Sequence, residues 1–171
     1  LGNLLLLIIG GNETTRNSMS ASVLLLNENP TEQRRLRANP ELIESMVSEV
    51  IRFQSPILAF RRTATQDTNL AGKTIREGER VVMWYISGNR DEDEFAEPHR
   101  FLLGRDNYRK HIAFGFGVHR CVGNRLAELQ LRVLWEEILA RDLRIEVVGA
   151  PKRQYSTFVH GIVELPVVIR Q

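Results

Sequence analysis

Residues 88–120 show neither helical nor strand periodicity, and they are rich in Gly, Asp, Asn and Pro. A structureless loop of this length inside a compact domain is uncommon and is usually functional. It leads directly into Cys121, the only cysteine of the chain, and apolar residues at helical spacing then predict a helix from Cys121 to about Ala140. Free amides and the helix dipole at such a start stabilise a thiolate. We therefore expect a functional site around Cys121.

The remaining pattern predicts an α+β chain that is mainly helical, with helices first and short strands after them. Gly10-Gly11 lies inside the first helix, where each glycine costs about 1 kcal/mol relative to alanine. Either the helix ends there and restarts near Asn12, or it is locally distorted so that another group can approach the backbone. The expected helices cover residues 1–27, 30–38 and 40–55, the expected strands 57–65, 70–75 and 80–86, and further β-hairpins 143–169.

Charge and hydropathy exclude several classes of protein. Lys and Arg number 23 against 21 Asp and Glu, and this net charge of +2 argues against a dedicated nucleic-acid binder, although a local basic face fits it. The longest apolar run, residues 4–9, is too short to span a membrane, and no charged leader precedes it, so we expect neither a membrane span nor a signal peptide. A single cysteine allows no internal disulfide and fits a reducing compartment, the cytoplasm.

Cys121 itself has two interpretations. A lone cysteine is most often a small buried apolar residue. Its neighbours favour a ligand instead, because glycines on both sides let the backbone approach a flat object, and His119 and Arg120 offer donors to anions. A thiolate presented in this way indicates a soft metal or a haem.

Four motifs resemble signatures of the cytochrome P450 family, and they follow one another along the chain in the family's order. Residues 114–123, FGFGVHRCVG, closely resemble its haem-thiolate loop. Residues 10–15, GGNETT, resemble the oxygen-activation stretch of its long central helix. Residues 49–52, EVIR, match its E-x-x-R pair, and residues 98–101, PHRF, match its P-x-R-F segment. Four motifs in family order leave little room for coincidence.

The resemblance implies the P450 fold over the whole chain, but only the C-terminal part of it. Residues 1–171 are expected to form the C-terminal portion of a single domain, with the long central helix, the E-x-x-R helix, small β-sheets, the haem-thiolate loop and the helix after it. The family's N-terminal half is then missing, and a start at Leu1 without Met indicates a fragment.

The resemblance also implies roles for the residues of the loop. Cys121 is expected to bind the iron of haem b (iron protoporphyrin IX), where a thiolate favours cleavage of the O–O bond of bound oxygen. Phe114 would shield the sulfur, and His119 and Arg62 would each reach a haem propionate. The alternative for His119 is a surface histidine. The expected cofactor-binding set is Arg62, Phe114, Gly115, His119, Cys121, Gly123 and Ala127.

Two further groups are assigned by the resemblance. Glu13 and Thr14 are the expected catalytic pair, an acid and an alcohol that relay protons to oxygen through water. The Thr14 hydroxyl can also bond back to a helix carbonyl. Glu49 and Arg52 share a helix face, and with Arg100 they are expected to form a partly buried structural triad. We expect Glu49→Ala to prevent haem incorporation.

The chain is most similar to bacterial soluble P450s that hydroxylate alkanes and fatty acids, through residues 16–20, 83–91 and 131–137. This implies hydroxylation by O₂ of an unactivated C–H bond, near the terminus of a medium-chain alkane or fatty acid. The alternatives are a hydroxylase of terpenoids, steroids or aromatics, a truncated non-catalytic fragment, and a thiolate metal site without haem. The expected apolar substrate pocket consists of Leu5, Ile9, Gly10, Ile57, Leu58, Ala59 and Phe158. Apolar residues at such positions belong to the hydrophobic core as often as to a pocket.

Electrons must come from a separate protein, since the chain contains no flavin or nucleotide motif. The expected partners are a ferredoxin and a ferredoxin reductase, with a hydrophobic small molecule as substrate. Basic residues near the loop would attract an acidic ferredoxin, or they form only a solvated face. These residues are Arg105, Arg109, Lys110, Arg120, Arg125 and Arg132.

Overall fold

The computed structural model describes residues 2–171, except for the side chain of Ile9. Its first element, α1 (Gly2–Glu28), runs as one helix through Gly10 and Gly11. The interpretation in which the helix ends at these glycines is therefore wrong. An added Cβ at either glycine would meet nothing within 4 Å. The chain continues as α2 (Pro30–Ala38), the 3-10 turn η1 (Pro40–Leu42) and α3 (Ile43–Gln54), close to the expected ranges.

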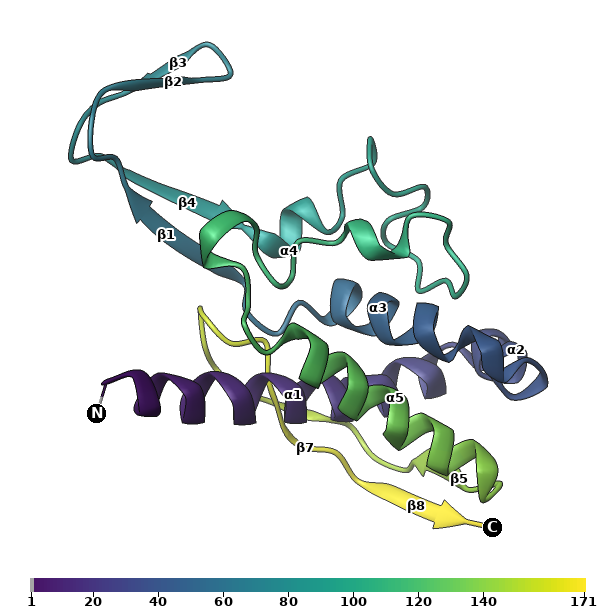
Figure 1. Cartoon of the computed structure of the whole chain (residues 1–171). Helices are drawn as coiled ribbons and strands as arrows, with labels where there is room; N and C mark the ends of the chain where they lie inside the picture. The colour runs from purple at the N-terminus through teal and green to yellow at the C-terminus, as the bar shows by residue number, and fades with distance from the viewer. Residues whose placement is uncertain (1) are drawn as a thin grey trace.

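Helices α1, α3 and α5 (Asn124–Ala140) pack against one another and enclose the core (Figure 1). Met46 and Val50 of α3 and Leu131 of α5 are fully buried there. Burial of each such side chain stabilises the fold by about 1.5–3 kcal/mol. Between α5 and α1, the indole Nε1 of Trp135 donates to Ser22 Oγ at 2.8 Å, so the polar atom of this buried ring is satisfied inside the core.

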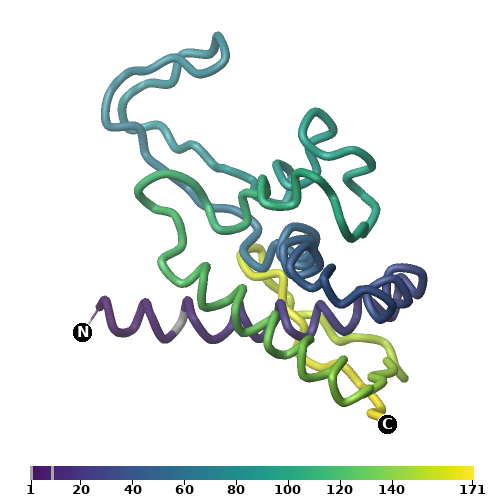
Figure 2. The backbone as a smooth tube through the Cα atoms, turned by 45° about the vertical axis from the view of Figure 1, so that its right-hand side comes forward, coloured from purple at the N-terminus to yellow at the C-terminus, as the bar shows by residue number. Residues whose placement is uncertain are grey.

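The strands form two-stranded antiparallel sheets. β1 (Ala59–Thr63) pairs with β4 (Arg80–Trp84), and the hairpin of β2 (Thr68–Leu70) and β3 (Lys73–Ile75) lies between them in the sequence. In Figures 1 and 2 this hairpin projects away from the helices. The strand expected over 80–86 ends early, because Tyr85 begins the single-turn helix α4 (Tyr85–Gly88).

The expected C-terminal hairpins take the form of two nested ladders. β5 (Arg144–Val147) pairs with the last strand, β8 (Val167–Arg170), and β6 (Lys152–Arg153) pairs with β7 (Ile162–Glu164) between them. The turn that joins β6 to β7 reaches back to the end of α3, where Val159 forms an isolated bridge with Ile57. This turn therefore lies against a segment far from it in the sequence.

The long loop is irregular, as expected, apart from two short 3-10 turns, η2 (Tyr108–Lys110) and η3 (Gly117–His119). Its last part forms an arch over the N-terminal half of α1 and then descends into α5 (Figures 1 and 2). Because α5 begins at Asn124, Cys121 lies in the arch, and the expected helix start was three residues too early. Within residues 2–171, no helix is long and apolar enough to cross a membrane.

Candidate functional site

The cysteine loop, residues 113–123, is closed by its own backbone. The amide of Cys121 donates to the carbonyl of Phe114 at 2.8 Å. Gly115 and Gly117 have φ values of +69° and +70°, a left-handed conformation that other L residues adopt only at a cost. This turn leaves the side chain of Cys121 exposed, so the interpretation of the cysteine as a small buried residue is wrong.

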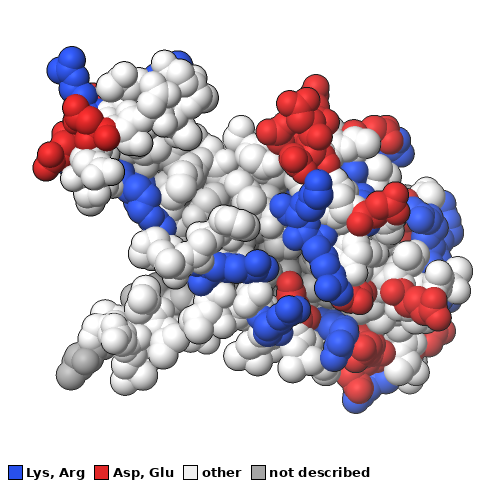
Figure 3. Space-filling view, turned by 45° about the horizontal axis from the view of Figure 1, so that its top comes forward, with Lys and Arg blue, Asp and Glu red and all other residues white. Residues whose placement is uncertain are grey.

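Apolar side chains next to the thiol are also exposed. Phe116, Val118 and Val122 are 85 %, 98 % and 86 % accessible. Grouped apolar exposure of this kind marks an interaction site on a folded chain. In Figure 3 a recess opens on the left, between the β2–β3 hairpin and the N-terminal half of α1, and most atoms around it belong to uncharged residues. The thiol is thus presented on an apolar surface.

The donor set of this loop fits a haem. Among the described residues, no group of three or more His, Cys, Asp or Glu could hold a metal ion. A site with one thiolate suits a metal that brings its other ligands with it, as haem iron does. Behind the thiol, the amide of Ala127 donates to the carbonyl of Gly123 at 2.9 Å, so α5 begins immediately after the loop.

Tyr85 supports the cysteine loop from beneath. A Cβ added at Gly115 would lie 3.1 Å from the Tyr85 hydroxyl oxygen, so this side chain would have to shift by a few tenths of an ångström to admit one. The buried ring of Tyr85 contacts Phe60 of β1 at a centroid distance of 5.9 Å, and Phe60 meets Phe158 edge-on at 5.5 Å. A row of aromatic rings therefore connects the cysteine loop with the turn between β6 and β7.

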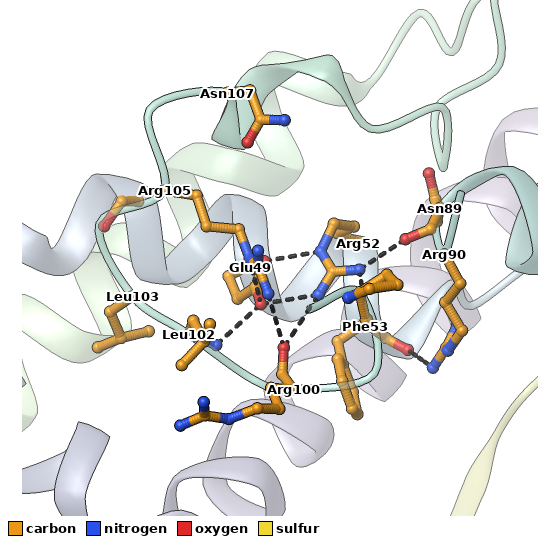
Figure 4. A network of polar contacts seen from close by, with 12 residues as sticks. Glu49, Arg52, Phe53, Asn89, Arg90, Arg100, Leu102, Leu103, Arg105 and Asn107 are labelled. Atoms are coloured by element: carbon orange, nitrogen blue, oxygen red, sulfur yellow. Dashed lines mark hydrogen bonds and ion pairs between the residues drawn. The ribbon is translucent and has the colours of Figure 1, made fainter. Parts of the chain in front are cut away.

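Glu49 lies at the centre of a buried cluster, but the third member of this cluster is Arg105 rather than Arg100 (Figure 4). Arg52 binds Glu49 through Nε at 2.7 Å and Nη2 at 2.8 Å, and Arg105 Nε lies 3.2 Å from Glu49 Oε1. Arg100 directs its guanidinium to Glu97 at the surface. The expected role of the Arg100 side chain is therefore wrong, because only its backbone carbonyl faces the buried arginines.

Two residues of this cluster were missed or misassigned from the sequence. The Arg105 side chain is only 7 % exposed, so its expected place on the basic surface is wrong. Asn89, fully buried, donates from Nδ2 to Ser55 Oγ at 2.8 Å and accepts from the amide of Ile112 at 2.7 Å. Its carbonyl also accepts from Arg52 Nη1 at 2.6 Å. These bonds fix the segment that leads into the cysteine loop.

Glu13 and Thr14 lie on α1, one turn after the glycine pair. Thr14 Oγ1 donates to the carbonyl of Gly10 at 2.6 Å, which is the back-bonding expected as an alternative. Both oxygens of Glu13 accept from Arg16 Nη2, each at 2.8 Å. Within the described residues, the Glu13 carboxylate and the Thr14 hydroxyl do not hydrogen-bond to each other.

The two expected propionate ligands differ in their surroundings. His119 lies in η3 and is exposed beside the cysteine loop. Arg62 is half buried on β1, where its Nη1 donates to the carbonyl of Arg61 at 3.0 Å and its guanidinium lies 5.9 Å from the Phe60 ring centroid. Neither forms an ion pair within residues 2–171, so both leave donors available to an anion.

The expected substrate-lining residues come from three elements. On α1, Leu5 and Gly10 are exposed, and the side chain of Ile9 lies outside the described part of the chain. Residues 57–59 are half buried between α3 and β1. Phe158, in the turn between β6 and β7, is 46 % exposed and accepts through its carbonyl from the middle residue of that segment, Leu58, at 3.0 Å. The structure therefore brings Phe158 to residues 57–59.

A polar pocket of about 320 Å³ opens between α3, the end of the long loop and α5. Arg120 lines it and forms no ion pair among the described residues, whereas the other arginines of its wall have acidic partners. Figure 3 accordingly shows Lys and Arg side chains gathered on one face with acidic side chains beside them. The paired arginines are Arg109 with Glu44, Arg125 with Glu128 and Arg132 with Glu136.

His111 lines the same pocket, and its Nδ1 is buried with no hydrogen-bond partner in the described structure. Burial, together with the positive charges of Arg120 and Arg52, lowers its pKa from 6.5 to about 4. The imidazole is therefore neutral at neutral pH, and it adds no charge to the basic wall.

Known proteins match this chain over nearly its whole length. The family model for Cytochrome P450 matches residues 1–165. Linalool 8-monooxygenase from Pseudomonas putida is 45 % identical over 169 residues, which cover 99 % of this chain and 41 % of that protein. Methyl-branched lipid omega-hydroxylase from Mycobacterium bovis is 40 % identical over 165 residues, which cover 95 % of this chain and 38 % of that protein.

A solved structure also matches this chain over nearly its whole length. Cytochrome P450-153 from Novosphingobium aromaticivorans has a TM-score of 0.96 and 49 % sequence identity, over 99 % of this chain and 43 % of that one. The chain thus spans about two fifths of the length of the proteins it matches.

Proposed function

The chain belongs to the cytochrome P450 family, and we propose that the protein is a haem-thiolate monooxygenase that hydroxylates an aliphatic chain. The fold class expected from the sequence is confirmed, and the family's cofactor is haem b. Residues 1–171 are proposed to be the C-terminal portion of one P450 domain. The observation that carries the proposal is the exposed thiol of Cys121, which a left-handed glycine turn presents on an apolar surface.

The residues of the loop are assigned to cofactor binding. Haem, when bound, supplies the redox chemistry that activates O₂ for insertion into a C–H bond. We assign Cys121 as its thiolate ligand and Phe114 as the apolar neighbour that limits access of water to the sulfur. His119 and Arg62, which have no ion-pair partner in the described structure, are assigned to the two propionates.

Glu13 and Thr14 are assigned to proton delivery. Because Thr14 uses its proton in the bond to Gly10, its oxygen lone pairs remain available to accept from a water molecule. Glu13 is half buried and bonded to exposed Arg16, so this carboxylate can exchange protons with solvent. In this assignment Thr14 orients the water, and Glu13 resupplies the proton.

The substrate is proposed to be a medium-chain alkane or fatty acid, hydroxylated near its terminus. The residues of the proposed wall are all uncharged, which suits an apolar chain; they are Leu5, Ile9 and Gly10 of α1, residues 57–59, and Phe158. The relative from Mycobacterium bovis is named for omega-hydroxylation of a methyl-branched lipid, which agrees with a terminal position. The relative from Pseudomonas putida is named for linalool, and this observation favours a terpenoid as the second candidate.

The proposed electron donor is a ferredoxin with its reductase. Support comes from the polar pocket on α5, whose wall carries Arg120 without an acidic partner in the described chain. An acidic partner would be steered to this wall by its charge, and the steering would weaken as salt rises. The chain has one cysteine and so no internal disulfide, and the cytoplasm is the proposed location.

A spectrum of the reduced protein with CO tests the proposal. We expect the red-shifted Soret band of thiolate ligation from the complete protein, and its loss in Cys121→Ser, which keeps the shape of the side chain but not the thiolate. A matched control is Tyr155→Ala, at a fully exposed side chain outside the site, which should keep the band. A complete protein without this band would refute the proposal. If only residues 1–171 lack it, the chain alone is a non-catalytic fragment.

A further inference from the structure

The turn between β6 and β7 is attached to the end of α3 by a reciprocal pair of hydrogen bonds. Gln54 Nε2 donates to the carbonyl of His160 at 2.6 Å, and His160 Nδ1 lies 2.7 Å from the carbonyl oxygen of Gln54. A carbonyl only accepts, so this geometry assigns the imidazole proton to Nδ1. Gln54 is 3 % exposed, and burial lowers the pKa of His160, which keeps the ring neutral.

Further backbone bonds transmit this attachment to Phe158. The amide of His160 donates to the carbonyl of Pro56 at 2.8 Å, and the amide of Leu58 donates to the carbonyl of Phe158 at 3.0 Å. Within the turn, Ser156 Oγ accepts from the amide of Phe158 at 3.1 Å. With its backbone held at both ends, Phe158 places its ring edge-on against Phe60.

The far end of the same turn is fixed to α1. Asn17, which is 1 % exposed, accepts through Oδ1 from the amide of Ile162 at 2.8 Å. Asn17 lies three residues after Thr14 on the same helix. The turn is therefore held between α3 and α1, and its position is set relative to the helix that carries the proposed proton-delivery residues.

We propose that Gln54 and His160 are positioning residues that set which apolar chains the protein binds, by holding Phe158 at the wall of the substrate site. The inference rests on the proposed function, which assigns Phe158 to that wall. In this proposal Gln54 and His160 act through the position of Phe158 and do not contact the substrate themselves. Partly buried hydrogen bonds between fixed groups favour one geometry, because an alternative position of the turn would leave a carbonyl or an imidazole without this partner.

Substitutions at His160 separate positioning from simple packing. His160→Leu removes the donor to Gln54, whereas His160→Asn keeps a donor the same number of bonds from Cα as Nδ1. We expect His160→Leu to raise the dissociation constant of dodecanoic acid by roughly threefold to tenfold, the range produced by one lost hydrogen bond. The constant is read from the Soret shift of the complete haem-loaded protein. His160→Asn should restore it to within about twofold, and Tyr155→Ala, at an exposed position of the same hairpin, should leave it unchanged.

Hydrogen exchange gives a second readout, which needs no substrate. The amides of Leu58 and His160 should exchange faster in His160→Leu and at the wild-type rate in His160→Asn. Unchanged exchange in His160→Leu would overturn the inference. So would faster exchange with an unchanged dissociation constant and unchanged hydroxylation positions, because the pair would then be merely structural.

The failures of the two proposals can be told apart. A wild-type protein that binds haem but no fatty acid would overturn the substrate assignment and this inference with it. A wild-type protein that binds dodecanoic acid, with His160→Leu behaving identically, would overturn this inference alone. Where His160→Leu does not load haem, Ser156→Ala replaces it, since it removes the acceptor of the Phe158 and Val159 amides, and the same directions are expected.

Discussion

Arg105 supplies the second guanidinium of the Glu49 cluster, with its Nε 3.2 Å from Glu49 Oε1 and its side chain 7 % exposed. It also donates from Nη2 to the backbone carbonyls of Glu97 and Arg100, at 3.0 and 2.9 Å. One buried carboxylate therefore holds two arginines that come from different parts of the chain, and each arginine in turn fixes loop carbonyls.

This relationship predicts that substitutions of Arg105 and Arg100, five positions apart, lower the stability of the fold by different amounts. Arg105→Met removes one of the two buried guanidiniums that contact Glu49, while Arg52 remains, and should lower the free energy of unfolding by about 1.5–3 kcal/mol. Arg100→Met removes only an exposed ion pair with Glu97 and should cost less than about 1 kcal/mol. Urea unfolding of both variants measures the difference. Equal losses would contradict the assignment of Arg105 to the cluster.

Loss of the carboxylate should be more severe than loss of either arginine. Glu49 accepts from Arg52, from Arg105 and from the amide of Leu102 at 2.9 Å, so Glu49→Ala leaves two buried guanidiniums without a counter-ion. We expect protein that does not incorporate haem, rather than loaded protein with slower turnover. The ratio of haem absorbance to protein absorbance in purified material measures this, with Arg100→Met as the control. Normal loading at normal yield would refute it.

The sequence predicted the half of this cluster that is local. Glu49 and Arg52 could be paired from the sequence because they lie three apart on one helix, where spacing alone places them on the same face. Arg105 lies 56 residues from Glu49, in a loop without periodicity, and nothing in its neighbourhood distinguishes its buried side chain from the exposed one of Arg100.

The same contrast holds for the rest of the fold and site. The helices and the strands β1 and β4 follow from apolar spacing and from Pro and Gly, so their ranges could be predicted to within a few residues. The single strand expected over 70–75 is wrong, because the chain turns at residues 71–72 and β2 pairs with β3 as a hairpin. The reciprocal bonds of Gln54 with His160 join residues 106 apart, and burial of Asn89 depends on the path of a loop. Tertiary contacts of this kind carry no local signal. The roles assigned to the residues near Cys121 came from motifs, and they remain predictions.

His111 predicts a pH dependence of stability. Its pKa is about 4 in the folded chain against an ordinary value of 6.5, so between these two values the unfolded chain binds more protons than the folded one. Stability should therefore rise with pH through this window, and it should be lost as the pH falls from 6.5 toward 4. His111→Leu has no such group, and its free energy of unfolding should fall less over the same window. Parallel curves from urea unfolding at several pH values would contradict the assignment.

Substitutions at two glycines of the cysteine loop distinguish the cost of backbone strain from the cost of a close contact with Tyr85. Both have φ near +70°, but a Cβ at Gly117 would meet nothing within 4 Å, whereas a Cβ at Gly115 would lie 3.1 Å from the Tyr85 hydroxyl oxygen. Gly117→Ala should thus cost only the left-handed strain, about 1–2 kcal/mol. Gly115→Ala should cost more, and adding Tyr85→Phe should recover the excess because it removes the crowded oxygen.

Thermal unfolding of the two single glycine variants, of Tyr85→Phe and of the double variant measures the coupling between Gly115 and Tyr85. Equal costs at the two glycines, or additivity of Gly115→Ala with Tyr85→Phe, would show that Tyr85 does not support the loop.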